Sequence, residues 1–243
     1  MFILCIRGVY ILKIGGEFDM IYLGHHLGLG DHIICNAIVR EYSKRGDLTI
    51  FCKEQYYESI YFLHRDLKNL HIVKVKEHSD IFEFLRDKDS NSIIIIGYGG
   101  KNWPYPNMTY NENFYLQAGI SFEKRWTSFY FERDIERENK LFDSLNINQP
   151  YIVLHEDKTR NYVIDRMFVK NRNIISIDIS LTNNIFDYYK VFENAEEIHV
   201  IESCFLFLID SIELKNKPLF AHRYARVYDW FNLPTLKKPW IIL

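Results

Sequence analysis

The chain has few cysteines and no paired-cysteine motif. Its four cysteines are scattered over 243 residues, and none lies in a CxxC pair or in a cluster with histidine. This argues against a zinc site, because zinc ligands lie at short, characteristic spacings. We interpret Cys5, Cys35, Cys52 and Cys204 as free thiols in a reducing, cytoplasmic compartment.

The chain also lacks an excess of charge of either sign. Thirty basic and 32 acidic residues give a formal net charge of -2, and the two signs are interspersed along the chain. No basic footprint for a nucleic acid is visible, so we expect small-molecule partners. The triplet DKD at 87–89 matches the DxD of metal-dependent sugar transferases, but it lies in a polar turn before a strand-like run. We therefore expect no metal ion and no cofactor.

No apolar run is long enough to cross a bilayer. The first fourteen residues, "MFILCIRGVYILKI", are interrupted by Arg7 and are followed by no small-residue cleavage site. We expect no integral membrane segment and no export signal. Residues 1–19 are either a dispensable extension or upstream start, or an added edge strand.

What the chain does have is a repeated alternation of strand-like and helix-like segments. Apolar, β-branched runs lie at 20–25, 48–52, 70–75 and 92–98, and again at 151–156, 173–180, 196–203 and 217–222. Helical patterns cover 31–45, 135–145, 185–194 and 204–213. This rhythm predicts an α/β protein with two small Rossmann-like domains, 1–133 and 134–243, whose parallel sheets face each other across a cleft. The tail 223–243 has no clear period.

A glycine-rich turn, "GHHLGLGDHI" at 24–33, precedes the most regular helical pattern. It is a poor dinucleotide fingerprint, because Ile33 stands where the third glycine belongs, and no G-K-[ST] follows for a Walker loop. Asp31 has the wrong charge for a phosphate at a helix start. It is either a base that takes a proton from a hydroxyl or simply the residue that caps the helix.

The stretch "HHLGLGDHIICNAIVR" resembles the N-terminal segment of GT-B glycosyltransferases related to the bacterial ADP-heptose transferases, and more closely short sugar transferases of surface-polysaccharide loci. The similarity continues through "NENFYLQAGI" and "YIVLHEDKTR" over most of the chain. It implies that Asp31 is the general base and that the second domain holds a nucleotide sugar. Through "VIESCFLFLIDSI" it places Ser203 and Cys204 beside the diphosphate.

The chain departs from the heptose transferases in two motifs. Their Asp-[Ser/Thr]-Gly turn reads Glu202, Ser203, Cys204 here, and "HEDKTR" replaces their lysine motif. The nucleotide and the sugar therefore stay open.

The candidate residues fall into two groups, one in each predicted domain. On the acceptor side we expect Gly28, Gly30, His26 and His32, with Trp103 and Tyr105 either stacking on a sugar or filling the groove between the domains. On the nucleotide-sugar side we expect His155, Asp157, Lys158, Arg160, Glu202, Ser203, Cys204 and His222, since Arg160 suits a diphosphate and Lys158 adds a point charge. The alternatives are a solvated charged loop for "HEDKTR", a salt-bridged strand end for Glu202, and C-terminal packing for His222 and Arg226.

Three classes of function are compatible with these residues. The first is a metal-independent glycosyltransferase that moves a sugar from a nucleotide-diphosphate sugar to a hydroxyl of a glycan acceptor. The second is a non-catalytic relative that binds nucleotides or glycans. The third is a methyltransferase that uses the glycine turn for its cofactor, with Glu54 just beyond the second strand. The oligomeric state stays open.

Overall fold

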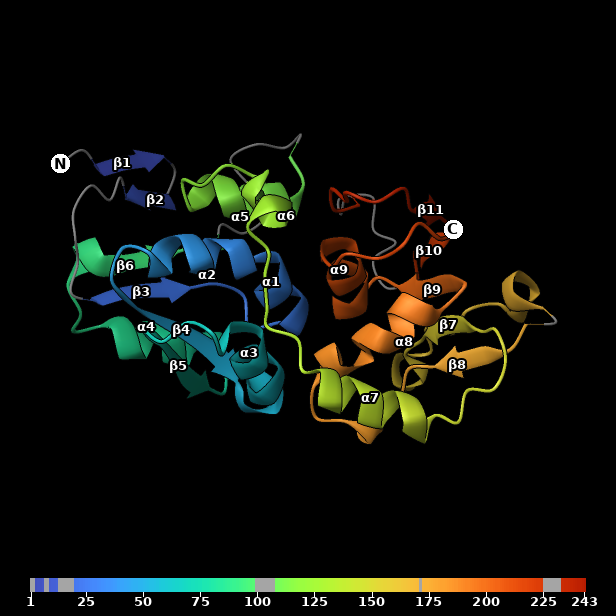
Figure 1. Cartoon of the computed structure of the whole chain (residues 1–243). Helices are drawn as coiled ribbons and strands as arrows, with labels where there is room; N and C mark the ends of the chain where they lie inside the picture. Colours follow the sequence, from blue (N-terminus) through green and yellow to red (C-terminus); the bar gives the residue numbers. More distant parts are fainter. Residues whose placement is uncertain (1–2, 7–8, 13–19, 99–107, 171, 225–232) are drawn as a thin grey trace. The chain divides into compact units, whose positions relative to one another are not determined.

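The computed structural model describes residues 3–6, 9–12, 20–98, 108–170, 172–224 and 233–243 (Figure 1). The chain divides into two compact units. Unit 1 comprises Met1–Glu132 and Asn232–Thr235, and unit 2 comprises Arg133–Phe231 and Leu236–Leu243. The segment 232–235 thus groups with unit 1, whereas the sequence analysis assigned it to the second domain. The reason is local: Asn111 Nδ2 donates to the Thr235 carbonyl, and Thr235 Oγ1 donates to Glu112 Oε1.

Unit 1 is built on a four-stranded parallel sheet in the order β5-β4-β3-β6. Its strands are β3 (Met20–Gly24), β4 (Asp47–Lys53), β5 (Leu70–Val75) and β6 (Ile93–Ile95). Leu23 in β3 stands opposite Ile50 of β4 on one side and Ile94 of β6 on the other. The central strands are apolar on both faces, as expected for a parallel sheet covered on both sides. The predicted parallel pairing is confirmed.

The helices of unit 1 follow the strands in alternation. They are α1 (Leu29–Ile34), α2 (Asn36–Ser43), η1 (Glu54–Tyr56), α3 (Tyr57–His64), α4 (His78–Leu85), η2 (Ser90–Ser92), α5 (Tyr110–Gln117) and α6 (Lys124–Thr127). The single helix predicted over 31–45 is two helices, because Cys35 at the junction has ψ near 1°, which is outside the helical range. In Figure 1, α2 and α4 lie on opposite sides of the sheet.

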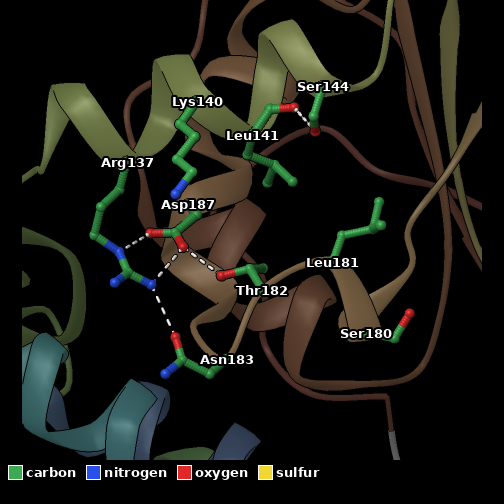
Figure 2. Close-up of a pocket in the computed structure, with 9 residues that line it drawn as sticks. All are labelled: Arg137, Lys140, Leu141, Ser144, Ser180, Leu181, Thr182, Asn183 and Asp187. Carbon is green, nitrogen blue, oxygen red and sulfur yellow. Dashed lines mark hydrogen bonds and ion pairs between the residues drawn. The ribbon is translucent and has the colours of Figure 1, made fainter.

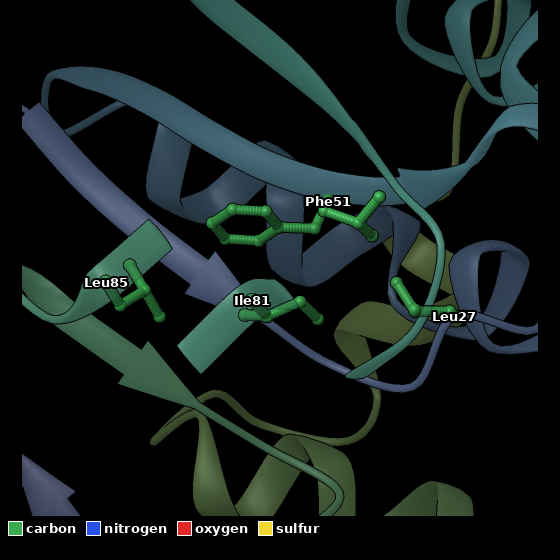
Figure 3. Close-up of a cluster of buried hydrophobic side chains, with 5 residues drawn as sticks. Leu27, Phe51, Ile81 and Leu85 are labelled. Atoms are coloured by element: carbon green, nitrogen blue, oxygen red, sulfur yellow. The ribbon is translucent and has the colours of Figure 1, made fainter. Parts of the chain in front are cut away.

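A cluster of buried side chains joins α4 to its face of the sheet (Figure 3). Ile81 and Leu85 of α4 pack against Phe51 of β4, Val75 of β5 and Leu27, which lies in the loop after β3. Each such side chain contributes roughly 1.5–3 kcal/mol when fully buried. The loop that leads to α1 is therefore anchored in the core by the side chain of Leu27.

The N-terminal residues form a hairpin of their own. β1 (Ile3–Ile6) and β2 (Val9–Leu12) pair with each other in antiparallel register, with Ile3 opposite Leu12. They make a separate two-stranded sheet. The alternative of an added edge strand is therefore wrong, because neither strand belongs to the four-stranded sheet.

Unit 2 is built on a five-stranded parallel sheet in the order β11-β10-β9-β7-β8. The strands are β7 (Ile152–His155), β8 (Ile174–Ser176), β9 (Glu197–Ile201), β10 (Leu219–His222) and β11 (Ile241–Ile242). The first four confirm the predicted second sheet. β11 was not predicted, because its two residues are too few for a periodic signal. It is a strand only because it pairs with β10, which lies about 20 residues earlier in the sequence.

The helices of unit 2 are short apart from α7 and α9. They are α7 (Ile135–Ser144), η3 (Lys158–Arg160), η4 (Arg166–Val169), η5 (Ile179–Leu181), η6 (Ile185–Tyr188), α8 (Tyr189–Asn194) and α9 (Cys204–Ser211). The apolar run of α9 is buried from Phe205 to Asp210. No helix in the described part of the chain is long and apolar enough to cross a membrane.

Candidate active site

The carboxyl end of the unit 1 sheet gathers ring side chains from the ends of three strands. His26 follows β3, His78 follows β5 and Tyr98 follows β6. The ring centroids are 5.8 Å apart for His26 and His78, 5.1 Å for His26 and Tyr98, and 5.5 Å for His78 and Tyr98. Ligands of open α/β sheets bind at this edge, so the three rings mark a candidate site.

Asp31 of α1 acts electrostatically on two of these rings. Burial lowers the pKa of His78, and the charge of Asp31 opposes this by raising it. Burial raises the pKa of Tyr98, and the charge of Asp31 raises it further. The carboxylate therefore lies within electrostatic range of both rings. A carboxylate beside a neutral imidazole and a phenol provides a proton acceptor together with hydrogen-bonding groups.

The carboxylate of Asp31 lies directly over Gly28. Gly28 is the residue that caps α1, whereas Asp31 is the third residue of the helix, and its own N–H donates to the Gly28 carbonyl at 3.0 Å. The alternative that Asp31 is the cap is therefore wrong. A Cβ added at Gly28 would lie 2.6 Å from Asp31 Oδ2, so a side chain at residue 28 would displace the carboxylate from this position. Gly30 is the second residue of α1 and is half-buried.

Three hydrogen bonds hold the loop between β3 and α1. The Tyr98 hydroxyl donates to the His25 carbonyl at 3.1 Å, the Leu27 N–H donates to His78 Nε2 at 3.3 Å, and His25 Nδ1 lies 2.7 Å from the His26 carbonyl. The sequence analysis missed both His78 and Tyr98. His78 lies three residues after the predicted strand 70–75, and Tyr98 is the last residue of the predicted strand 92–98, so a search of every strand end would have found them.

His32 lies in the core beneath this loop, in contrast to its predicted place in the acceptor site. It is 1% exposed, and its ring meets that of His25 at 4.4 Å. Burial lowers the pKa of His25 to about 4, that of His64 to about 3 and that of His32 well below its usual range. All three are therefore neutral at physiological pH. Within the described residues, no three His, Cys, Asp or Glu side chains are arranged to hold a metal ion.

Three of the predicted positions have no structural description. Trp103, Tyr105 and Arg226 lie outside the described residues.

At the carboxyl end of the unit 2 sheet, Ser203 and His155 lie together. Ser203 caps α9, its Oγ accepting from the Phe205 N–H, and the same Oγ lies 3.2 Å from His155 Nδ1. Burial lowers the pKa of His155 to about 4 and raises the pKa of the neighbouring Cys204 thiol to about 12. Both side chains are neutral at physiological pH, so this end of α9 offers hydroxyl and N–H groups for an anion.

The acidic residues of "HEDKTR" hold their own loop. Asp157 accepts from Thr159 Oγ1 and from Arg160 Nε, both at 2.6 Å, and these groups lower the pKa of Asp157 to about 2. Glu156 accepts both guanidinium nitrogens of Arg166, at 2.6 and 2.8 Å. Lys158 is exposed. Arg160 would therefore have to exchange its partner Asp157 for a diphosphate.

Glu202 and His222 have structural partners. Arg223 Nε lies 3.6 Å from Glu202 Oε1, which is the salt-bridged strand end given above as the alternative for Glu202. His222 is fully buried, and its Nε2 lies 3.0 Å from His199 Nδ1. His199 Nε2 in turn lies 2.8 Å from Glu197 Oε1. His222 is thus a core residue that has no exposed surface for a leaving group, contrary to its predicted role.

Unit 2 also contains a cavity of about 460 Å³ between α7 and the segment after β8 (Figure 2). Its lining is Arg137, Lys140, Leu141, Ser144, Ser180, Leu181, Thr182, Asn183 and Asp187. Arg137 donates to both carboxylate oxygens of the buried Asp187, at 2.9 and 2.8 Å. The sequence analysis named none of these residues, because they come from a helix and a loop that the motifs did not connect.

The architecture allows comparison with known structures. The chain aligns over 95% of its length with "the glycosyl transferase family 9" from Veillonella parvula DSM 2008, covering 88% of that chain at 10% identity with a TM-score of 0.56. The fold is that of a GT-B glycosyltransferase. The ADP-heptose lps heptosyltransferase II of E. coli matches over 93% of this chain and 90% of its own, at 8% identity and a TM-score of 0.54.

A third similar structure is larger than this chain. It is the iron-containing dodecameric glycosyltransferase TibC of enterotoxigenic E. coli H10407, which matches at 9% identity and a TM-score of 0.55. The match covers 93% of this chain but 65% of TibC, so the chain spans less than two thirds of that protein. No protein-family model and no curated protein sequence matches the chain.

Proposed function

We propose that the protein is a metal-independent glycosyltransferase that moves a sugar from a nucleotide-diphosphate sugar to a hydroxyl of a glycan acceptor, as in polysaccharide synthesis. The observation that carries this proposal is the Asp31 carboxylate, at the carboxyl end of the unit 1 sheet in the first turn of α1. The GT-B fold supports it, because sugar transfer is what the three structural neighbours are named for.

In this proposal Asp31 is the general base. The acceptor hydroxyl gives its proton to the carboxylate, and its oxygen forms the new bond to the anomeric carbon of the donor. The bond between that carbon and the diphosphate breaks, and the nucleoside diphosphate leaves with the electron pair. Positioned general bases typically contribute about 10²–10⁴-fold to the rate.

Unit 2 supplies the groups for the diphosphate. The first N–H groups of α9, the Ser203 hydroxyl and the exposed ammonium of Lys158 suit an anion. Arg160 joins them on leaving Asp157, since its guanidinium can bind a diphosphate through two parallel hydrogen bonds.

The test of the base is Asp31→Asn, which keeps the shape of the side chain and removes its charge. We expect turnover to fall at least about a hundredfold, while the thermal shift produced by the donor nucleotide is retained. Asp47→Asn is the matched control, because Asp47 is an exposed acid at the amino end of β4. Near-wild-type turnover in Asp31→Asn would exclude Asp31 as the base.

A second candidate is a non-catalytic relative that binds nucleotides or glycans. This candidate is favoured because two residues expected to bind the donor already have partners within the protein: Arg160 pairs with Asp157, and Glu202 pairs with Arg223. A thermal-shift panel of UDP, GDP, ADP and CMP sugars separates the two candidates. Stabilisation by one nucleotide sugar, followed by its slow hydrolysis, supports the enzyme. Stabilisation without hydrolysis, or no shift with any nucleotide sugar, favours the second candidate.

A further inference from the structure

One backbone N–H of the loop that leads from β3 to Asp31 is held by a side chain that follows another strand. The Leu27 N–H donates to His78 Nε2 at 3.3 Å. Leu27 precedes the capping residue Gly28, and its side chain packs on Ile81 of α4, the helix that begins at His78 (Figure 3). α4 therefore holds the loop twice, through an apolar contact and through a hydrogen bond.

The position of His78 is fixed by the start of α4. Glu77 caps this helix, and Asp80 Oδ2 accepts from the N–H groups of Glu77 and Lys76, at 3.2 and 2.8 Å. His78 is the first residue of the helix, where the macrodipole disfavours a positive charge. Since Nε2 accepts a hydrogen bond, the neutral ring carries its proton on Nδ1.

The groups around His78 come from every neighbouring strand end. Partial burial has the largest effect on the pKa of His78 and lowers it. His26 and Lys53 lower this pKa further, and Asp31 and Glu77 raise it. The Tyr98 ring lies in edge contact with it. His78 is also exposed, so its ring exchanges protons with the solvent directly.

We propose that His78 is a positioning residue for Asp31, which holds the loop through the Leu27 N–H only while its Nε2 carries no proton. The proposal rests on the proposed function for its link to catalysis. Protonation places an N–H of the ring against the N–H of Leu27, which breaks the hydrogen bond and leaves the backbone donor unpaired. Misplacement of a catalytic group by about 1 Å costs roughly a hundredfold in rate, so a loosened loop lowers turnover.

The decisive variants are His78→Gln and His78→Ala. The glutamine Oε1 accepts from the Leu27 N–H and does not titrate, whereas alanine removes the acceptor. The matched control is His71→Ala, because His71 is an exposed histidine on the adjacent β5.

The first measurement is amide hydrogen exchange of Leu27 by NMR between pH 5 and 8, expressed as a protection factor to remove the intrinsic pH dependence. In the wild type we expect protection to fall about tenfold toward acid pH, equivalent to a net hydrogen bond of about 1.4 kcal/mol. His78→Gln should retain protection throughout, and His78→Ala should lack it at every pH. Equal protection in wild type and His78→Ala overturns the proposal.

The second measurement is the pH profile of kcat and KM for sugar transfer. His78→Ala should lower kcat about tenfold at pH 8 with little change in KM. His78→Gln should keep most of the wild-type kcat at pH 8, and its kcat should not fall toward acid pH as that of the wild type does. A glutamine variant as slow as the alanine variant contradicts the proposal. If no variant and no wild-type protein transfers sugar, the proposed function fails, and amide exchange still decides whether His78 holds the loop.

Discussion

The Asp31 carboxylate occupies the space that a side chain at residue 28 would need, since a Cβ on Gly28 would approach Asp31 Oδ2 to 2.6 Å. The backbone of Gly28 itself is ordinary, with φ of -72°. The glycine therefore matters for the space that it leaves to the carboxylate and not for its conformational freedom. It lets the acid fold back over the loop at the sheet edge.

Gly28→Ala should lower turnover because its methyl group displaces the carboxylate. We expect a loss of about ten- to a hundredfold in kcat, as for a catalytic group moved by about 1 Å. Steady-state kinetics of Gly28→Ala, Asp31→Asn and the double variant form the test. If Gly28 acts through Asp31, the double variant is no slower than Asp31→Asn alone. Losses that multiply would mean that the two positions act separately.

The sheets could be predicted from the sequence because parallel strands are continuous apolar runs. "LTIFC" covers a strand that is buried on both faces, and "SIIIIGY" covers a strand whose residues are buried or half-buried, so local composition was enough. β11 could not be found in this way, since its two residues form a strand only through pairing with β10. The break between α1 and α2 at Cys35 likewise leaves the apolar pattern unchanged.

The candidate site could be predicted only in part, because charge and hydrogen-bonding capacity do not reveal burial. Asp31 was singled out by its place after a glycine turn, and its role as a base, which the resemblance implied, stays a prediction. His32 and His222 have suitable chemistry but are 1% and 0% exposed, and only the packed structure shows this. His78 and Tyr98 lie 47 and 67 positions after Asp31 in the sequence, and the order of the strands brings them to the same edge.

Asn36 should be a major stabilising residue of unit 1. Its Nδ2 donates to the Tyr130 carbonyl at 3.1 Å, and its Oδ1 accepts from the Tyr130 N–H at 3.0 Å, with the side chain fully buried. Asn36→Ala leaves the Tyr130 N–H without this acceptor and should destabilise unit 1 by about 1–3 kcal/mol. Urea unfolding followed by circular dichroism measures the change. An unchanged midpoint would show that water replaces the amide at no cost.

Asp187 should stabilise unit 2 from beside the cavity of Figure 2. It is 3% exposed and accepts from Arg137, Asn184 Nδ2 and the Thr182 hydroxyl. Asp187→Ala removes the acceptor that these donors share and should cost about 1–3 kcal/mol. Glu196→Ala is the control, since its ion pair with Arg172 is exposed and should be worth less than about 1 kcal/mol. Equal urea midpoints for the two variants would contradict the assignment.

The buried histidines of unit 1 should make its stability depend on pH. Burial lowers the pKa of His25 to about 4 and of His64 to about 3 in the folded state, whereas in the unfolded chain both should titrate near 6.5. As pH falls below about 6.5 the unfolded state takes up protons first, so stability is lost toward acid pH. Each residue should cost about 2 kcal/mol by pH 5.

This pH dependence is assigned by removing one titrating group. His64→Gln keeps a polar side chain next to Asn36, from which His64 Nδ1 lies 3.5 Å, but it takes up no proton in this range. Whatever its stability at pH 7, we expect this variant to lose about 2 kcal/mol less than the wild type between pH 7 and 5. The measurement is urea unfolding at half-unit pH steps. Parallel curves for the two proteins would show that His64 is protonated in the folded state as readily as in the unfolded chain.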